Sequence, residues 1–177
     1  MNLPPPSCNL RFITMDAPHL LHFYVSPGHN FFGRHGLAPG THLVAEPDTI
    51  RCVAERGIEG DRFFAHEPGH KGQITFFAAE VYVELCALLA VRDRPPSVFR
   101  RNVITRGLDL DALIGAEFAV QGVRFRGLAE CKPCHWMNSV FHPEAEAQLQ
   151  GRGGLRAKIL SDGPLTLGPA QLEIFPL

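Results

Sequence analysis

The sequence predicts a mainly β protein, either a barrel or a sandwich, with only a few helices. Short β-prone segments recur along the chain, glycine-containing turns separate them, and only one long segment has helical periodicity. Many short strands with few helices are typical of these two architectures. The expected strands cover residues 20–26, 50–55, 117–120, 123–126, 155–160 and 165–167.

One helix is expected from about Thr75 to Ala90, and Pro95 and Pro96 prevent it from extending further. Its apolar residues recur at helical spacing, at Phe77, Val81, Leu85 and Leu88. A second, short surface helix is expected over residues 143–150, with a proline in its first turn.

Two dipeptides, Gln121-Gly122 and Asp162-Gly163, each lie between two expected strands. Glycine permits the positive φ angle that tight hairpin turns require. We therefore expect two β-hairpins in the second half of the chain.

The chain of 177 residues has the size of one domain, and no change in composition divides it. We expect a single domain over residues 1–177, with a loose N-terminal arm over residues 1–18. The net charge of −1 predicts no general attraction to nucleic acid or to an anionic membrane. No apolar run is long enough to span a bilayer.

Five cysteines occur, at Cys8, Cys52, Cys86, Cys131 and Cys134. The number is odd, and the first residues lack the basic and apolar regions of a secretory signal. A disulfide framework is therefore not expected, and a reducing, cytoplasmic location fits better.

The segment Glu130–His135 is the most informative stretch, because it places a Cys-x-x-Cys pair at the end of an expected strand. Such a pair occurs in thioredoxin-like dithiols, in c-type haem attachment, in zinc sites and as two buried thiols. A redox pair needs a long helix after it, and haem attachment needs export. A zinc site would need a second ligand pair, and because Cys52 and Cys86 are isolated, His66 and His70 would have to complete it across the fold. Lys132 and His135 make the strand end electropositive, which favours a reactive or metal-binding thiolate.

Five segments of the chain, in this order, resemble MOSC domains, which are named after the C-terminal part of molybdenum cofactor sulfurase. The resemblance covers roughly residues 20–175 and implies a β-barrel with a few short helices. The segments are RGIEGDRFF (56–64), GQITF (72–76), FRRNVITRGLDLDALIGAEF (99–118), ECKPC (130–134) and GLRAKILSDGPLTLG (154–168).

The resemblance also implies which residues form the site. The family's characteristic cysteine corresponds to Cys134, which would carry sulfur or coordinate molybdenum, whereas Cys131 is a resolving thiol or a bystander. Contacts with a molybdopterin cofactor are implied for two motifs, at Asp61, Arg62, Arg100, Arg101 and Asn102. Arginine forks suit the cofactor's phosphate, although the same residues would also serve in a strand-end turn or in solvent.

The implied function is molybdenum cofactor binding through the Cys134 thiolate, for sulfur carriage or for reduction of small N-hydroxylated or N-oxide compounds. Two alternatives remain: a non-catalytic module that stores or delivers the cofactor, and a zinc or dithiol redox protein that uses the cysteine pair. Pyridoxal phosphate is not expected in this chain. The implied partners are an electron-donor reductase or a cysteine desulfurase, together with a small-molecule substrate.

Residues 26–40 are too rich in glycine for a helix and too aromatic for a solvated linker. We expect a packed functional loop or a shaped hairpin end. If it folds over a pocket, His29, Asn30 or His35 would serve as hydrogen-bond donors or proton carriers. Surface histidines without a task are an equally good interpretation.

Overall fold

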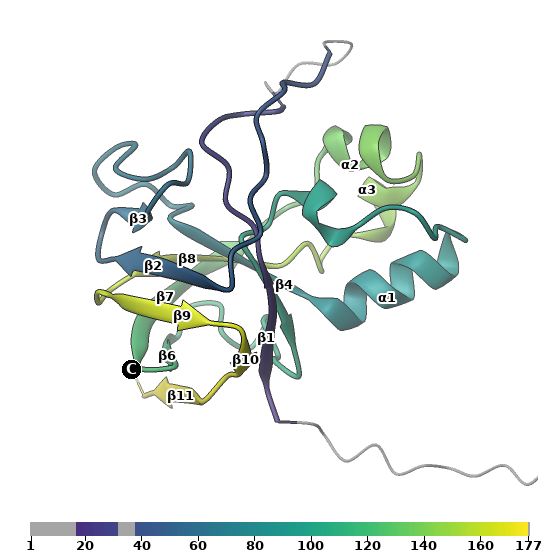
Figure 1. Cartoon of the computed structure of the whole chain (residues 1–177). Helices are drawn as coiled ribbons and strands as arrows, with labels where there is room; N and C mark the ends of the chain where they lie inside the picture. Colours follow the sequence, from purple (N-terminus) through teal and green to yellow (C-terminus); the bar gives the residue numbers. More distant parts are fainter. Residues whose placement is uncertain (1–16, 32–37, 177) are drawn as a thin grey trace, which may run out of the picture.

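The computed structural model describes residues 17–31 and 38–176. The N-terminal arm expected over residues 1–18 lies outside the described residues, apart from its last two positions. The strands form two β-sheets, with the helices grouped on one side (Figure 1).

The larger sheet has eight strands in the order β10-β1-β5-β4-β8-β7-β6-β11. All neighbours are antiparallel except β4 and β5, which run parallel. Its two edge strands, β10 and β11, are separated by only two residues, so the sheet must curl until its edges approach each other. The strands are β1 (His19–Phe23), β4 (Ile74–Ala78), β5 (Val103–Arg106), β6 (Glu117–Val120), β7 (Val123–Glu130), β8 (Leu155–Ile159), β10 (Gly168–Pro169) and β11 (Leu172–Phe175).

The smaller sheet has the order β3-β2-β9, formed by Gly57–Ile58, Thr49–Val53 and Gly163–Thr166. Together the two sheets confirm the mainly β, barrel-like class that the sequence predicts. Strand pairs such as β2–β9 join residues more than a hundred positions apart, so side chains that are distant in sequence meet at the ends of strands.

Three short α-helices and one 3-10 helix form a second layer against the sheet (Figure 1). They are α1 (Ala79–Leu88), η1 (Pro96–Phe99), α2 (His135–Val140) and α3 (Ala145–Gln148). Their apolar sides share a buried cluster that includes Phe77, Leu85, Phe99 and Met137. Among the described helices, none combines the length and the apolar character that a bilayer crossing requires.

The expected helix over residues 75–90 is correct only in its second part, because Ile74–Ala78 forms strand β4 and α1 begins at Ala79. Strand β4 lies between β5 and β8, where Phe76 and Phe77 are buried on opposite faces of the sheet. A strand buried on both faces has a continuous apolar run, which periodicity alone cannot distinguish from a helix. The short helix expected over residues 143–150 is present as α3.

The hairpin expected at Gln121-Gly122 joins β6 and β7, and both turn residues have positive φ, 51° and 81°. The hairpin expected at Asp162-Gly163 is wrong. Strand β8 pairs with β4 and β7, whereas β9 pairs with β2 in the smaller sheet. The Asp162 carboxylate instead accepts a hydrogen bond from the backbone of Ala54 (2.7 Å) just beyond β2.

The interior of the curled sheet is held by three aromatic rings, Phe76, Phe118 and Phe125, all almost completely buried. Their ring centroids lie 5.5–6.1 Å apart in edge-on and tilted arrangements. Such contacts add to the apolar area that the rings bury.

Replacing Phe125 with alanine should lower the free energy of unfolding by about 3–5 kcal/mol, because the cavity left by the ring cannot collapse against two other rings. Chemical denaturation followed by circular dichroism measures this loss. Ile174→Ala is a suitable control, since this side chain is 56% exposed and should change stability little. Equal effects of the two substitutions would contradict the assigned core.

Candidate functional site

Arg101 lies in the interior just before β5, and backbone groups surround its guanidinium. Nε donates to the carbonyl of Gly153 (2.9 Å), Nη1 to Phe99 (2.9 Å) and Nη2 to Cys131 (2.7 Å). Burial lowers the pKa of this residue, which is only 6% exposed, and the three carbonyls compensate for the water that its charge has lost. Arg101 therefore joins three segments that are far apart in sequence.

Hydrogen bonds hold the backbone of Cys131 through both its N–H and its carbonyl group. Its N–H donates to the carbonyl of Gly154 (2.6 Å), and its own carbonyl accepts from Arg101. A Cβ atom at Gly153 would lie 2.4 Å from the Cys131 carbonyl oxygen, so only glycine permits this close approach. The path of the Cys-x-x-Cys segment is thus fixed by backbone contacts at its first cysteine.

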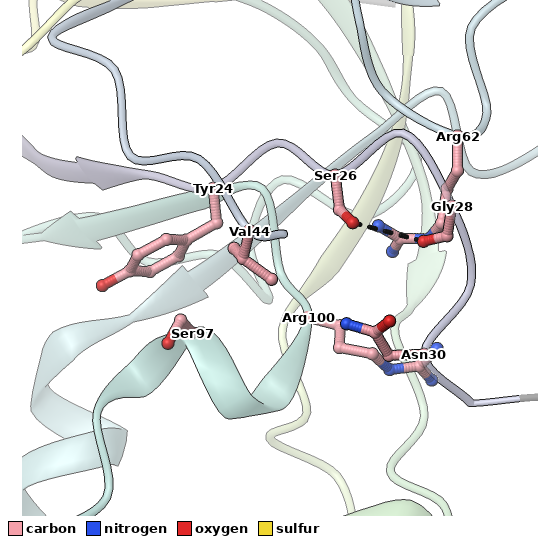
Figure 2. Close-up of a pocket in the computed structure, with 8 residues that line it drawn as sticks. All are labelled: Tyr24, Ser26, Gly28, Asn30, Val44, Arg62, Ser97 and Arg100. Carbon is pink, nitrogen blue, oxygen red and sulfur yellow. Dashed lines mark hydrogen bonds between the residues drawn. The ribbon is translucent and has the colours of Figure 1, made fainter. Parts of the chain in front are cut away.

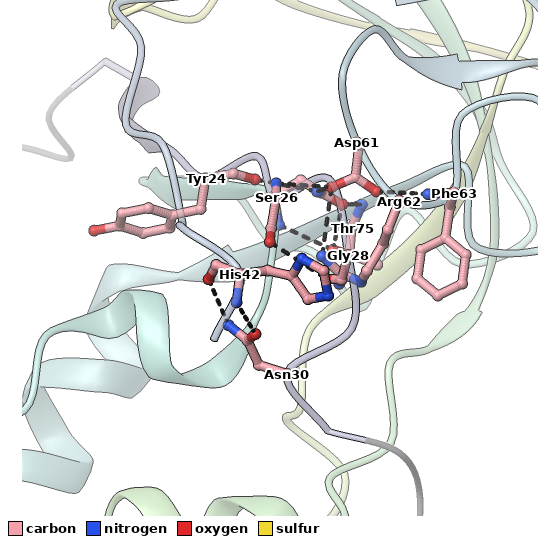
Figure 3. A network of polar contacts seen from close by, with 10 residues as sticks. Tyr24, Ser26, Gly28, Asn30, His42, Asp61, Arg62, Phe63 and Thr75 are labelled. Atoms are coloured by element: carbon pink, nitrogen blue, oxygen red, sulfur yellow. Dashed lines mark hydrogen bonds and ion pairs between the residues drawn. The ribbon is translucent and has the colours of Figure 1, made fainter. Parts of the chain in front are cut away.

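Asn102 centres a second network, which binds the chain after β1 to β4 and to the Asp61 turn. Figure 3 shows its partners Tyr24, Asp61 and Thr75. Its Nδ2 donates to the Tyr24 carbonyl and to Asp61 Oδ2, both at 3.2 Å. Its Oδ1 accepts from the N–H (3.1 Å) and the hydroxyl (2.8 Å) of Thr75. Asp61 Oδ1 also accepts from the N–H of Phe63 (3.0 Å). The polar atoms of both buried side chains are therefore occupied within the fold.

Beside these networks lies a hollow of about 470 Å³ that we call the cationic hollow. Its wall comes from the chain after β3, strand β4, the residues before β5, the end of β7 and strand β8, and the described lining residues include no acidic side chain. The lining residues are Arg62, Phe63, His70, Gly72, Thr75, Arg100, Arg101, Cys131 and Arg156.

Three buried side-chain nitrogens in the described part of the chain have no hydrogen-bond partner: Nε of Arg62, Nε of Arg100 and Nε2 of His70. All three residues line the cationic hollow. A buried polar group without a partner costs about 1–3 kcal/mol. A ligand with acceptor oxygens would accept hydrogen bonds from the two arginine donors. The third nitrogen, Nε2 of His70, can donate or accept a hydrogen bond, as the ligand requires.

Arg100 reaches the hollow although its neighbour Arg101 points into the interior. Its backbone is left-handed (φ 56°, ψ 34°), a conformation that non-glycine residues rarely adopt. Its guanidinium carbon lies 5.2 Å from the ring centre of Phe31 and 5.5 Å from that of Trp136. Burial, together with the positive charge of Arg62, lowers the pKa of Arg100 to about 10, so the side chain remains a cation at neutral pH.

Cys134 directly precedes α2 and is half-buried, whereas Cys131 is only 3% exposed. A negative charge on Cys134 would raise the pKa of Arg100, which places the thiol within electrostatic range of that guanidinium. The two cysteines therefore differ in accessibility, and Cys134 is the more accessible thiol of the pair.

The other uses of a Cys-x-x-Cys pair find little support in this geometry. Helix α2 after Cys134 has only six residues, too short for a thioredoxin-like arrangement. Within the residues that the structure describes, neither cysteine of the pair joins a group of three potential metal ligands.

A second hollow, of about 300 Å³, shares Arg62 and Arg100 with the first (Figure 2). Its remaining lining is neutral, and the hydroxyl of Ser26 is bonded to the carbonyl of Gly28 (3.3 Å). Arg62 and Arg100 therefore line both hollows. The other lining residues are Tyr24, Ser26, Gly28, Asn30, Val44 and Ser97.

Within the loop expected over residues 26–40, residues 26–31 form one side of a long arm, and the chain from residue 38 onward forms the other side (Figure 1). Val25 and Ala45 pair across it, and Asn30 exchanges two hydrogen bonds with the backbone of His42 (2.8 and 2.9 Å). Asn30 therefore shapes the arm, while its side-chain oxygen and nitrogen are both in use. His35, the third candidate in this loop, lies outside the described residues.

His29 is close to the cationic hollow, with its ring edge-on to Phe63 at 5.2 Å. Partial burial lowers the pKa of His29, and the charges of Arg62 and Arg100 lower it further. This histidine is therefore uncharged at neutral pH.

Of the sequence-predicted residues, Arg62, Arg100 and Arg101 line the cationic hollow, whereas Cys134, Asp61 and Asn102 are not among its lining residues. The Nε atoms of Arg62 and Arg100 have no partner, although Nη1 of Arg62 donates to Asp61 (3.4 Å). The hydrogen bonds of Arg101 and Asn102 go to the protein itself. Sequence reasoning did not assign His70 or Arg156 to this wall, since neither belongs to the two motifs. His70 is a single polar residue in a loop and Arg156 one on a strand, and no motif around either residue predicts a binding site.

Comparison with known proteins identifies the family. The profile of the MOSC domain matches residues 64–168, more than half of the chain, and the chain belongs to this family. The family is associated with binding of molybdenum cofactor. A comparison with curated proteins gives no match.

Solved structures support the same fold. The YuaD protein of Bacillus subtilis aligns with a TM-score of 0.66 and 18% identity, over 89% of this chain and 95% of that one. YiiM from Geobacillus stearothermophilus aligns with a TM-score of 0.62 and 14% identity, over 88% and 75%. YiiM from Escherichia coli gives 0.60 and 16%, over 88% and 69%.

Arg101→Lys should lower the free energy of unfolding by about 3 kcal/mol or more, because one ammonium cannot reach three carbonyls that surround a planar guanidinium. Chemical denaturation measures the loss. Arg124→Lys is the matched control, since Arg124 is exposed and its side chain contacts Glu117 and the Phe175 ring at the surface, and this change should stay within about 0.5 kcal/mol. If the Arg101→Lys protein is as stable as the parent, Arg101 does not anchor these three segments.

The pKa of His29 should lie below its ordinary value of 6.5, and Arg100→Gln should raise it because one repelling charge is gone. Since its folded pKa is the lower one, its contribution to stability is present above pH 6.5 and is lost as the pH falls. An NMR titration of the ring protons measures both proteins, with His19 as internal reference. A His29 pKa that is unchanged by the substitution would contradict the proximity of the arginines.

Proposed function

We propose that this protein binds molybdenum cofactor at the cationic hollow, with the Cys134 thiolate as metal ligand and Arg62 and Arg100 as the groups that hold its anionic part. The observation that carries the proposal is that the residues with unpartnered buried nitrogens line one hollow, together with Cys131, the first cysteine of the pair. These donors are matched by a ligand that is rich in acceptor oxygens.

The chemistry of the donor set fits the cofactor. A thiolate is a soft ligand that suits such a metal, and arginine binds phosphate through two parallel hydrogen bonds. Four arginines line the hollow, and among the described residues only Arg62 of the four has an ion pair there, with Asp61 (3.4 Å), so a phosphate would meet an excess of positive charge. Arg156, which is exposed on β8, adds a cation that can adjust to the ligand.

The contacts support a division of labour among the residues of the two motifs. Arg62 and Arg100 would touch the cofactor, whereas Arg101, Asn102 and Asp61 would position them and the cysteine segment through backbone bonds. Asn102 and Arg101 then affect the cofactor indirectly, through the shape of the hollow.

Two activities fit this site, sulfur carriage and reduction of small N-hydroxylated or N-oxide compounds. When bound, the cofactor would supply two-electron transfer of an oxygen atom. In the reductase version the smaller hollow next to Arg62 and Arg100 would receive the substrate, neutral His29 would hold or accept a proton at a ring nitrogen, and a reductase would supply electrons.

In the carrier version a persulfide on Cys134 is the working species, and a cysteine desulfurase would load it. The half-buried Cys134 thiol favours this possibility, because a partner can reach it while Cys131 is sealed. Cys131 would then serve neither as a resolving thiol nor as a ligand. A module that only stores or delivers the cofactor would need the same binding residues and no turnover.

The proposal is tested by molybdenum and pterin analysis of protein purified from a host that makes the cofactor. We expect about one equivalent of each in the parent protein and strong loss of molybdenum in Cys134→Ser, because serine is a poor soft-metal ligand. Arg62→Gln and Arg100→Gln should each weaken cofactor binding by roughly 10- to 150-fold, since one charge-assisted contact contributes about 1.5–3 kcal/mol.

Arg124→Gln, at the far end of β7, and Cys131→Ser are the matched controls and should retain the cofactor. Turnover of an N-hydroxylated base with a reductase separates the reductase from the storage module, and a Cys134 persulfide in mass spectrometry supports the carrier. Equal cofactor content in the Arg62, Arg100 and Arg124 variants would contradict the assignment of Arg62 and Arg100 as the anion-binding residues.

A further inference from the structure

A cluster of His66, Glu67 and His70 lies in the turn between β3 and β4, outside the two motifs used above. One side-chain donor atom from each residue lies within 4.8 Å of the others. Across the residues that the structure describes, this is the one group of three histidine, cysteine or acidic side chains that meets such a spacing.

The local sequence His66-Glu67-Pro68-Gly69-His70 explains why three donors meet. In a helix the two histidines of such a pattern would share a face and the glutamate would point elsewhere. Here the segment is a turn, with the His70 N–H donating to the Glu67 carbonyl (3.2 Å) and Gly69 at φ 73°. The turn brings Glu67 to the same side as the histidines.

The donors have nearly the spacing that a tetrahedral metal requires. Bonds of about 2.0–2.1 Å from zinc to nitrogen or oxygen place two ligand atoms roughly 3.3 Å apart. The distance from Glu67 Oε1 to His70 Nδ1 is 3.3 Å. His66 and Glu67 are exposed and can move the remaining ångström or so without disturbing the core.

Aromatic contacts hold the two imidazoles beforehand. The Phe63 ring stacks on His70 at 4.7 Å and 22°, and it meets His66 edge-on at 5.7 Å. The two imidazole rings lie 5.2 Å apart. A metal ion would therefore bind at little cost in side-chain freedom for His70, whose ring is 18% exposed.

We propose that His66, Glu67 and His70 form a binding site for a divalent transition-metal ion of the zinc type, separate from Cys134. Two imidazoles and one carboxylate suit zinc and leave a position open for water or a ligand. Neither cysteine of the pair takes part. His70 also lines the cationic hollow, so the ion would lie at its rim, and the carboxylate of Glu67 offsets the positive charges nearby.

Titration of the full-length protein with Zn²⁺ by calorimetry, and with Co²⁺ by absorption spectroscopy, tests this site. We expect one equivalent of zinc to bind and a cobalt spectrum without a thiolate charge-transfer band. His66→Gln and His70→Gln should each weaken zinc binding by more than about tenfold, and Glu67→Gln by a smaller factor.

His19→Gln, at the opposite end of β1, and Cys134→Ser should bind zinc as the parent does. Because His66 is exposed, its variant should remain folded, which circular dichroism checks. Failure to bind a stoichiometric equivalent would overturn the proposal. So would binding that survives His66→Gln but disappears in Cys134→Ser, since the cysteine site would then be the metal site.

Discussion

The arrangement of the site depends on one buried cation, the guanidinium of Arg101. Its three hydrogen bonds to carbonyl oxygens tie the 3-10 helix before β5 to the end of β7 and to the loop before β8. A buried charge is tolerated only where such partners replace water. Because one partner is the carbonyl of Cys131, the position of Cys134 three residues later follows from the same contact.

This constraint lets two adjacent arginines perform opposite tasks. Arg101 continues into β5 and points inward, whereas the left-handed backbone of Arg100 turns its side chain to the hollow. Residues in rarely populated backbone regions often occur at functional sites, where surrounding contacts hold them. Here Phe31 and Trp136 flank the Arg100 guanidinium, whose Nε has no hydrogen-bond partner.

Local features of the fold could be predicted from the sequence, whereas partner choice could not. The β6–β7 hairpin follows from its own turn residues, but Asp162-Gly163 joins strands of different sheets, because β9 finds its partner more than a hundred residues away. The site shows the same limit. The motifs predicted Arg62 and Arg100 together with Arg101, but only the three-dimensional contacts separate free donors from occupied ones.

The most direct test of this account compares the arginine side chains by NMR of their ¹⁵N-labelled Nε–H groups, with inorganic phosphate as the added anion. We expect the Nε–H resonances of Arg62 and Arg100 to shift with phosphate, because these donors have no partner in the protein, and that of Arg101 to stay in place, because it donates to Gly153. A shift confined to Arg101, or no shift in any of the three, would contradict the account.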